Sequence, residues 1–518
     1  MINKSSDSLF ELVRSMSQSE KRYLKQYAKR YSKNTKSNYY LILFNELDKL
    51  VKKSIKYDEA ALKEKIKKEK WITQFAVTKS YLYDLILDSL RSCNKATTTT
   101  VEINELLIDS QNLFFKGLHS QALNRLRKAR MICESLGHYN LLGEVNYWIK
   151  RGLILKEKYN DDDMKLFIDS QFNPFTPRRI SEHLKLLDRA IEIQFFNRDA
   201  GYSMKTEQNR KKFIDKFFKD GPELIETVSD EPIDLLRLKY GTTALYYQFA
   251  DNRKESAKHY QLALNLMERN ERYLQDNIRA YISYTMGLSI QHYFLGNYVE
   301  LQELTKKLKI VSDKNYKTVP RTVTSDALAH IININFSMDQ KRGEFEYSVD
   351  EIDAGLEEWV KKSGFRSSAF SLLMYNIGMT HFMTQNFKKA AKAWNDLIAM
   401  SIKNNYLDNI SSSRMMLCFA ALEMKDEELL QSRTGSWKYF IETREMFFPA
   451  EKVVYKFFTS KRQMADLIEM KTILANILKE NDSINDFFDI WNWIESKVNK
   501  TTFAEAVKVY YDQKGHAL

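Results

Sequence analysis

The chain contains little glycine and proline, with 15 Gly and 6 Pro among 518 residues. These 21 residues are about 4% of the chain, whereas the two types make up about 12% of average proteins. Glycine and proline interrupt helices and form turns, so their scarcity predicts long helices with few breaks. We therefore expect an all-α protein in which β-sheet is negligible.

Cysteine is also rare, and Cys93, Cys133 and Cys418 stand in no CxxC or Cys/His spacing. The sequence therefore predicts neither a disulfide framework nor a zinc site. No stretch approaches the roughly 18 uninterrupted apolar residues that a membrane span requires. The opening residues, MINKSSDSLF, lack an apolar core of signal-peptide length. We expect a soluble, cytoplasmic protein without a membrane partner.

Recognisable catalytic motifs are missing as well. The chain has no phosphate-binding P-loop, no GxGxxG after a strand and no HExxH, and its eight histidines are scattered. The adjacent carboxylates of Asp161, Asp162 and Asp163 could attract a cation, although such runs are usually solvated. We expect no cofactor, no metal and no enzymatic activity. An active site in the segment from Asp161 to Arg179 is the remaining enzyme hypothesis.

Positive charge is concentrated near the N-terminus. Residues 1–95 contain 21 Lys or Arg and 11 Asp or Glu, a net charge of +10, whereas the other 423 residues carry 59 and 57. Because a concentrated positive field attracts polyanions, nucleic acid is a possible partner of this segment. The candidate polyanion-binding residues are Lys21, Arg22, Lys25, Lys29, Arg30, Lys33, Lys67, Lys68, Lys70 and Lys79.

Helical signals divide this basic segment. Ser17 and Glu20 have the spacing of a capping box, which predicts the start of a first helix. A second helix is predicted over about 38–53, Asp58 is a plausible N-cap for a third, and a longer helix is predicted over about 73–92. The apolar residues of these helices recur at helical spacing, which is what the core of a bundle requires.

The last two of these helices loosely resemble a helix-turn-helix. In that interpretation Gln74, Thr78 and Lys79 lie near the start of the recognition helix, where side chains could reach base edges. The competing interpretation is that the long helix simply packs in the core of the bundle. The sequence leaves both open.

A recurring pattern of small and large residues marks the rest of the chain. In its clearest copy Gly378 precedes Ala390 by twelve residues and Trp394 by sixteen. Small residues at such offsets let two helices approach, which predicts antiparallel helix pairs. Gly117 and Gly296 stand where a pair must turn back. The other copies are Ser110, Leu113, Ala122, Leu126, Ala129; Ala244, Tyr247, Ser256, Tyr260, Ala263; and Ser289, His292, Leu301, Thr305, Leu308.

These helix pairs resemble the units of the tetratricopeptide family, which stack into a right-handed superhelix and usually bind peptides or proteins on its concave face. The family repeat is about 34 residues, whereas Ala122, Ser256, Leu301 and Ala390 lie 134, 45 and 89 residues apart, close to multiples of about 45. We therefore expect longer helices. Abundant Lys, Asn, Ile and Tyr resembles the composition of proteins from AT-rich bacteria. The basic helical start followed by a long array resembles helical-repeat proteins of Bacteroidetes-type bacteria, which implies a bacterial source.

The resemblance implies that the first helix of each unit lines an inner surface. Its aromatic and methionine side chains would suit an apolar peptide or helix. The same side chains could instead be ordinary core if the helices wind tightly. The candidate groove residues are Tyr375, Met379, Phe382, Met383, Phe114, Phe115 and Phe249.

The predicted fold is all-α, with a basic N-terminal helical bundle followed by a TPR-like α-solenoid of long helix pairs. We predict domains at 1–95, 101–450 and 451–518, the last an aromatic C-terminal helical cap, with an irregular loop at about 160–180. The run KATTTT marks the first boundary. The predicted function is a non-enzymatic scaffold for a protein or peptide. The alternative is a nucleic-acid-associated regulator, similar to bacterial peptide sensors that join a DNA-binding unit to TPR-like repeats.

Overall fold

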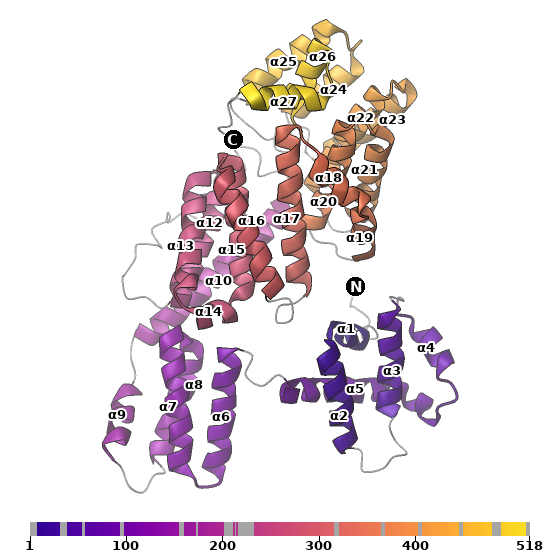
Figure 1. The fold of residues 1–518 in the computed structure, drawn as a ribbon. Coiled ribbons are helices and arrows are strands. Elements are labelled where there is room, and N and C mark those ends of the chain that lie inside the picture. The colour runs from indigo at the N-terminus through magenta and orange to yellow at the C-terminus, as the bar shows by residue number, and fades with distance from the viewer. Residues whose placement is uncertain are drawn as a thin grey trace. The chain divides into compact units, whose positions relative to one another are not determined.

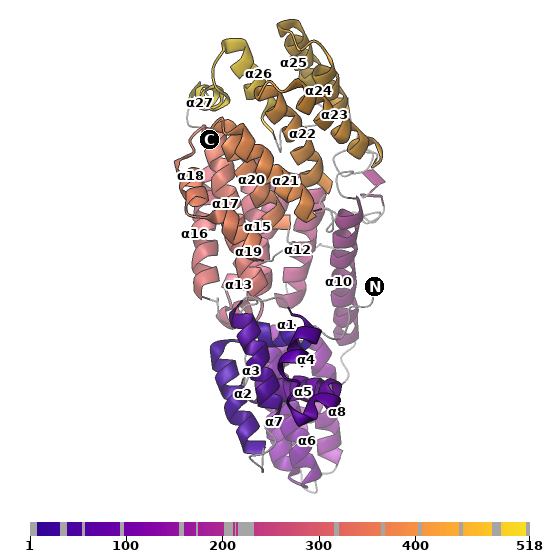
Figure 2. The same ribbon diagram turned by 90° about the vertical axis from the view of Figure 1, so that its right-hand side faces the viewer.

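A computed structural model of the chain consists of helices (Figures 1 and 2). It describes residues 8–31, 39–53, 57–93, 98–154, 160–171, 175–200, 211–212, 214–215, 233–314, 321–363, 368–401, 407–444, 449–478 and 488–513. Helices make up 88% of the structure, and these ranges contain no strand. The all-α prediction is confirmed. No helix in the same ranges is long and apolar enough to cross a membrane.

The chain divides into two compact units, residues 1–172 and 173–518. The domain limits predicted from the sequence stay predictions, and residues 94–97 of the first limit lie outside the described ranges. The helical elements of the first unit are α1 (Ser8–Ser15), α2 (Gln18–Tyr31), α3 (Tyr39–Lys52), α4 (Glu59–Lys65), the 3₁₀ turn η1 (Lys70–Gln74), α5 (Phe75–Cys93), α6 (Thr99–Phe115), α7 (His119–Leu136), α8 (Tyr139–Ile154) and α9 (Asp161–Asp169).

The predicted helix starts in the basic segment are present. The backbone amide of Ser17 donates to the Glu20 carboxylate at 2.7 Å, and the Glu20 amide donates to Ser17 Oγ at 3.3 Å, which is a capping box. Asp58 caps α4 by accepting from two backbone amides of its first turn. Helices α1 to α5 share one hydrophobic core, in which Phe44, Leu82 and Ile86 are fully buried.

The segment predicted as an irregular loop at about 160–180 is largely helical. Helix α9 opens with a capping box between Asn160 and Asp163, and α10 already begins at Phe175. Asp163 is buried and accepts from Arg127 Nη2 at 3.1 Å. The loop prediction is therefore wrong for α9, because three aspartates in the first turn favour a helix through capping and the helix dipole.

The second unit contains the remaining described helices, several of which pack on their neighbours in chain order. They are α10 (Phe175–Ala200), α12 (Ile233–Phe249), α13 (Arg253–Glu268), α14 (Glu271–Asp276), α15 (Ile278–Leu295), α16 (Tyr298–Lys314), α17 (Arg321–Arg342), α18 (Glu346–Asp353), α19 (Leu356–Ser363), α20 (Ser368–Met383), α21 (Phe387–Ser401), α22 (Leu407–Glu423), α23 (Glu427–Glu442), α24 (Pro449–Thr459), α25 (Met464–Leu478), α26 (Ile490–Asn499) and α27 (Phe503–Gln513).

The same tight turn joins consecutive helices at several places in the described residues, among them the pairs α6–α7, α12–α13, α15–α16, α20–α21 and α22–α23. In each turn one residue adopts a left-handed conformation, and the next amide donates to the carbonyl five residues earlier at 2.7–3.1 Å. This arrangement is a Schellman motif. The left-handed residues are Gly117, Asp251, Gly296, Gln385 and Lys425, with φ of 75, 61, 75, 64 and 57°. The turns predicted at the two glycines are confirmed.

Small residues let the paired helices approach, as predicted. A Cβ at Gly378 would lie 2.3 Å from Nε1 of Trp394, so only glycine allows α20 to meet α21 at this distance. In α12–α13 the small residue Ser256 donates to the Ala244 carbonyl at 2.9 Å. Ala390 is also fully buried.

The α22–α23 pair is a fifth copy that the sequence pattern did not reveal. Cys418 stands seven residues before the left-handed Lys425, as Gly378 stands seven before Gln385. The large Leu430 occupies the position of Ala122, Ser256 and Ala390, as Leu301 does in α15–α16, but here the first position also departs from the pattern, because it holds Cys418 instead of Gly, Ala or Ser. With both positions changed, a search for small residues at fixed offsets passes over this pair.

The C-terminal helices share the largest core with α20 to α23. Phe488, Trp493 and Phe503 are buried in it, and Phe488 lies 4.6 Å from the ring of Phe419 in α22. The neighbouring Phe487 lies outside the described residues. Aromatic side chains of the C-terminal helices thus belong to this core, and their role as the cap of a repeat array stays a prediction.

Candidate partner-binding pocket

The first helices of the pairs do not line an open groove at the predicted residues. Tyr375, Met379, Phe382 and Met383 in α20 are buried, as is Phe114 in α6; Phe382, for example, is only 2% exposed. The prediction that they contact a partner is therefore wrong, and the competing core interpretation is confirmed. Phe115 is 81% exposed and Phe249 is half-buried.

The surroundings of α20 explain this burial. Phe382 packs against Trp394 of α21, and against Phe488 and Phe503 of the C-terminal segment, with ring centroids 5.9–6.3 Å apart. Helices α17, α21 and α22 also contact α20. A helix with apolar residues on all sides must be covered on all sides, and α20 satisfies that requirement within its own unit.

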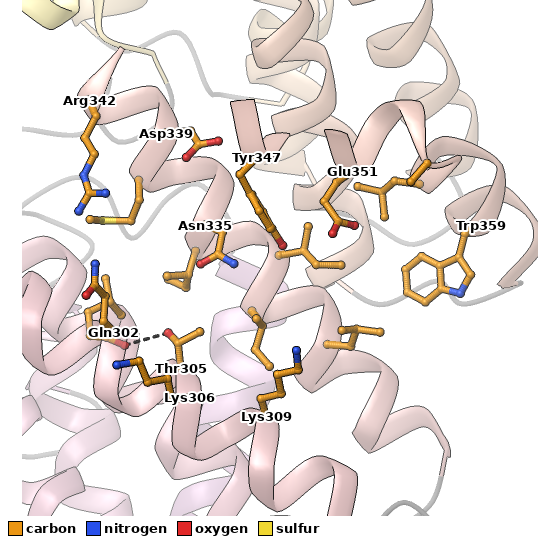
Figure 3. A pocket seen from close by; sticks show the side chains of 18 of the residues that line it. Gln302, Thr305, Lys306, Lys309, Asn335, Asp339, Arg342, Tyr347, Glu351 and Trp359 are labelled. Atoms are coloured by element: carbon orange, nitrogen blue, oxygen red, sulfur yellow. Dashed lines mark hydrogen bonds between the residues drawn. The ribbon is translucent and has the colours of Figure 1, made fainter. Parts of the chain in front are cut away.

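A different hollow, the α16–α19 pocket, lies on the second unit and has a volume of about 790 Å³. Its walls come from α16, α17, α18 and α19 (Figure 3). This volume lies within the roughly 300–1,000 Å³ range of ligand-binding clefts. The lining residues are Leu301, Gln302, Thr305, Lys306, Lys309, Leu328, Ile331, Ile332, Ile334, Asn335, Met338, Asp339, Arg342, Tyr347, Glu351, Ala354, Gly355, Leu356 and Trp359.

The floor of the pocket is apolar, and part of it is open to solvent. Ile331, Ile334 and Met338 of α17 are buried in it. Leu328 is 43% exposed and Trp359 is 36% exposed. Water-exposed apolar side chains that surround a hollow, rather than being scattered singly, are typical of an interaction site.

Charged side chains flank this floor on two sides. Figure 3 shows Lys309 on the α16 side pointing toward Tyr347 and Glu351 of α18, whereas Lys306 of the same helix points away from them. Lys306 pairs with Glu303 at 2.8 Å. Within the described ranges, Lys309, Arg342 and Glu351 form no ion pair, and Nε of Arg342 is buried without a hydrogen-bond partner. The pocket therefore presents charged groups that form no ion pair within the described ranges, and the charge of Arg342 acts on the nearby Asp339 carboxylate.

Hydrogen bonds hold the α18 wall in place. The Asp339 carboxylate accepts from the Ser348 amide at 3.0 Å and from the Ser348 hydroxyl at 2.7 Å, which joins α17 to α18. Burial raises the pKa of Asp339, and burial also raises the pKa of the Tyr347 hydroxyl. Gly343, with φ of 69°, makes the turn between the two helices. The wall that carries Tyr347 and Glu351 is thus fixed to α17.

Several candidate polyanion-binding residues are engaged within the first unit. Lys21 is buried and donates to Asp48 at 2.7 Å, and Lys79 donates to Glu59 at 2.8 Å. The prediction that these two lysines bind a polyanion is wrong, because their charges are already compensated in the bundle. Lys67 pairs with Glu64 at the surface.

Among the remaining basic candidates whose side chains are described, Lys25 is half-buried, and its Nζ lies 5.7 Å from the centroid of the Phe44 ring. Arg22, Lys29 and Lys68 are exposed. The exposed candidates stay a prediction. The side chains of Arg30, Lys33 and Lys70 lie outside the described residues.

The helix-turn-helix interpretation fails at two of its three residues. Thr78 is buried and its hydroxyl donates to the Gln74 carbonyl at 3.0 Å, while Lys79 is held by Glu59. Gln74 is exposed but belongs to the short turn η1. The long helix α5 instead packs in the bundle with Leu82 and Ile86.

Comparison with known proteins finds no family model and no curated protein that matches the chain.

Proposed function

We propose that the protein is a non-enzymatic interaction scaffold, in which helix pairs similar to tetratricopeptide units stack into a solenoid and present the α16–α19 pocket to a partner protein. One observation carries the proposal: apolar side chains of this pocket remain exposed beside charged groups that have no ion-pair partner in the described ranges. A partner protein that covers the apolar floor would remove the exposed apolar surface from water, and its opposite charges would pair with the charged groups of the pocket.

The chemistry of the pocket favours one kind of occupant, an amphipathic helix with acidic residues along one edge. Its apolar side would cover Leu328 and Trp359, as in other helix-in-groove complexes. Its carboxylates would face Lys309 and Arg342, and a basic residue on the opposite edge would face Glu351. Complementary charges of this kind also fix the register of the bound helix.

Affinity capture from the native cell, with and without nuclease, tests the proposal. The bait is the full chain, compared with Leu328→Glu, which places a charge on the exposed pocket floor, and with Val299→Glu as a matched control. Val299 is exposed on α16 and does not line the pocket. We expect Leu328→Glu to lose a protein that the wild type and the control both capture, with nuclease making no difference. Equal capture by both variants contradicts the proposal.

The regulator alternative rests on the net charge of +10 over residues 1–95. It predicts that capture depends on nucleic acid, so that nuclease releases the partner, and that a labelled nucleic acid binds with a steep salt dependence. Because Lys21 and Lys79 are engaged by Asp48 and Glu59, the basic surface that this function needs would consist of the other candidates.

A further inference from the structure

Arg414 of the α22–α23 pair has two arginines in its surroundings, Arg433 and Arg444, whose charges both act on it. Arg414 belongs to α22, Arg433 belongs to α23, and Arg444 lies just after the end of α23. The guanidinium carbons of Arg414 and Arg444 lie 4.9 and 4.1 Å from the centroid of the same ring, that of Phe440. Two cations therefore share one aromatic side chain, which packing alone does not require.

Polar neighbours orient the side chains of Arg414 and Arg433, two residues that are half-buried. Arg414 Nη1 donates to the Ser436 hydroxyl at 2.7 Å, and Arg433 Nη1 donates to the Asn395 side-chain oxygen of α21 at 3.4 Å. Nε of Arg414 is buried and has no hydrogen-bond partner in the described part of the protein. The cluster thus keeps at least one donor unsatisfied, and an unsatisfied buried donor is costly.

Carboxylates do not compensate these charges. None of the three arginines forms an ion pair within the described ranges, and the nearby Glu442 pairs with Lys438 at 3.7 Å. Burial lowers the pKa of Arg414, and the charges of Arg444 and Arg433 lower it further. Arg444 Nη1 donates to the Phe440 carbonyl at 3.4 Å, at the C-terminal end of α23, which offsets part of its charge. Like charges without a carboxylate beside them still repel, and an anion reduces that repulsion.

We infer that Arg414, Arg433 and Arg444 form a binding site for a phosphoryl group. A phosphoryl group carries about two negative charges at neutral pH and offers three acceptor oxygens. Guanidinium groups donate to such oxygens in pairs, which makes arginine the residue best suited to this recognition. A carboxylate has one negative charge and two oxygens, so it offsets less of the positive charge of the three arginines. The inference does not depend on the α16–α19 pocket.

The phosphoryl group could come from free inorganic phosphate or from a phosphorylated side chain. Arg444 and Ser436 are exposed, so an ester attached to a larger molecule can approach from solvent. The two sources share the same chemistry at the arginines and differ only in the group that the ester oxygen carries. A test therefore compares inorganic phosphate with O-phosphoserine.

Thermal unfolding of the full chain, at fixed ionic strength set by chloride, measures this binding. Millimolar inorganic phosphate should raise the Tm by roughly 2 °C or more relative to chloride. The variant Arg433→Gln/Arg444→Gln should lose the shift. The control Lys254→Gln/Arg279→Gln removes the same charge from two exposed residues of α13 and α15 and should keep it. Acetate should have no comparable effect on the wild type.

The outcomes are decisive in either direction. A phosphate shift that the arginine variant loses and the control keeps supports the site. A larger shift with O-phosphoserine than with inorganic phosphate assigns it to phosphorylated side chains, and a smaller shift assigns it to free phosphate. The absence of a shift in the wild type, or equal shifts in all three proteins, overturns the inference. The single variant Arg444→Gln changes only an exposed side chain, so its phosphate shift, which should be smaller than that of the wild type, gives the same decision if the double variant does not fold.

Discussion

Gly378 of α20 lies directly against the indole of Trp394 of α21. A Cβ at residue 378 would come within 2.3 Å of Nε1 and 2.6 Å of Cε2 of that indole. Trp394 is fully buried, and its Nε1 donates to the Tyr375 carbonyl at 3.3 Å. The indole is therefore held from several directions, so the absence of a side chain at residue 378 sets the distance between the two helices.

The first prediction concerns Gly378→Ala. In an exposed helix this change usually stabilises by about 0.5–1 kcal/mol, because alanine has the higher helix propensity. Here the added methyl would overpack the contact with Trp394, and overpacking costs about 1–3 kcal/mol. We expect the variant to have a lower Tm than the wild type in a calorimetric scan.

Gly435→Ala is the matched control. Gly435 lies within α23, and nothing is found within 4 Å of a Cβ built at that position. The propensity gain should then appear alone, as a rise of roughly 0.5–1 kcal/mol in stability. A shift of the Tm in the same direction for both substitutions would contradict the close contact between Gly378 of α20 and Trp394 of α21.

The second prediction separates core from surface among the residues expected to form a groove. Phe382→Ser should destabilise by about 3–5 kcal/mol, the range for truncating a buried Phe, because Phe382 is enclosed by Trp394 and Phe503. Phe115→Ser, at a position that is 81% exposed, should leave the urea midpoint nearly unchanged. Similar midpoints for the two variants would show that Phe382 is not in a core.

The positions of helices and the close contacts between paired helices could be predicted from the sequence, because both depend on the spacing of residues that are near one another in the chain. The capping box of Ser17 and Glu20, the small residue Gly378 and the turn at Gly296 each lie within one or two helices, so sequence offsets report them. The burial of Phe382 could not be predicted in the same way. It depends on Phe488 and Phe503, more than a hundred residues later, and no local pattern records such a contact.

The third prediction is a pH dependence in the first unit. The hydrogen bond from Lys79 lowers the pKa of Glu59 to about 2, and Lys63 contributes to the same effect. In the unfolded chain the pKa of Glu is about 4.3. A lowered pKa contributes stability that is present above the unfolded pKa and is lost as pH falls through the folded pKa. This contribution is therefore complete at neutral pH and fades between about pH 4 and pH 2.

Lys79→Met tests this link. The variant should be less stable than the wild type at pH 7, and the difference should shrink as the pH falls to about 3, as measured by urea unfolding with circular dichroism. Lys67→Met removes a surface charge whose partner, Glu64, is also exposed, and should show little difference at any pH. If the free energy of unfolding of Lys79→Met differs from that of the wild type by the same amount at every pH, the ion pair with Glu59 is not the cause of the difference.

The pocket itself could not be predicted from the sequence. Its floor and rims combine Leu328 with Lys309 and Trp359, which belong to three helices with different apolar faces. Charge counting was also insufficient, because it gave Lys21 and Lys309 equal weight. Only the fold shows that Asp48 compensates the first, whereas the second has no ion-pair partner in the described ranges.

Photo-crosslinking from the pocket floor tests the proposed function most directly. A photoreactive phenylalanine analogue replaces Leu328 in one bait and Val299 in the other, both in the full chain, and the crosslinked peptides are sequenced after irradiation in the native cell. We predict that position 328, and not position 299, captures a peptide with apolar residues at helical spacing and carboxylates along one edge, and that Lys309→Glu abolishes its capture. Three results would contradict the proposal. The crosslinked peptide could lack this pattern, its capture could be unchanged by Lys309→Glu, or both positions could give the same crosslinked products.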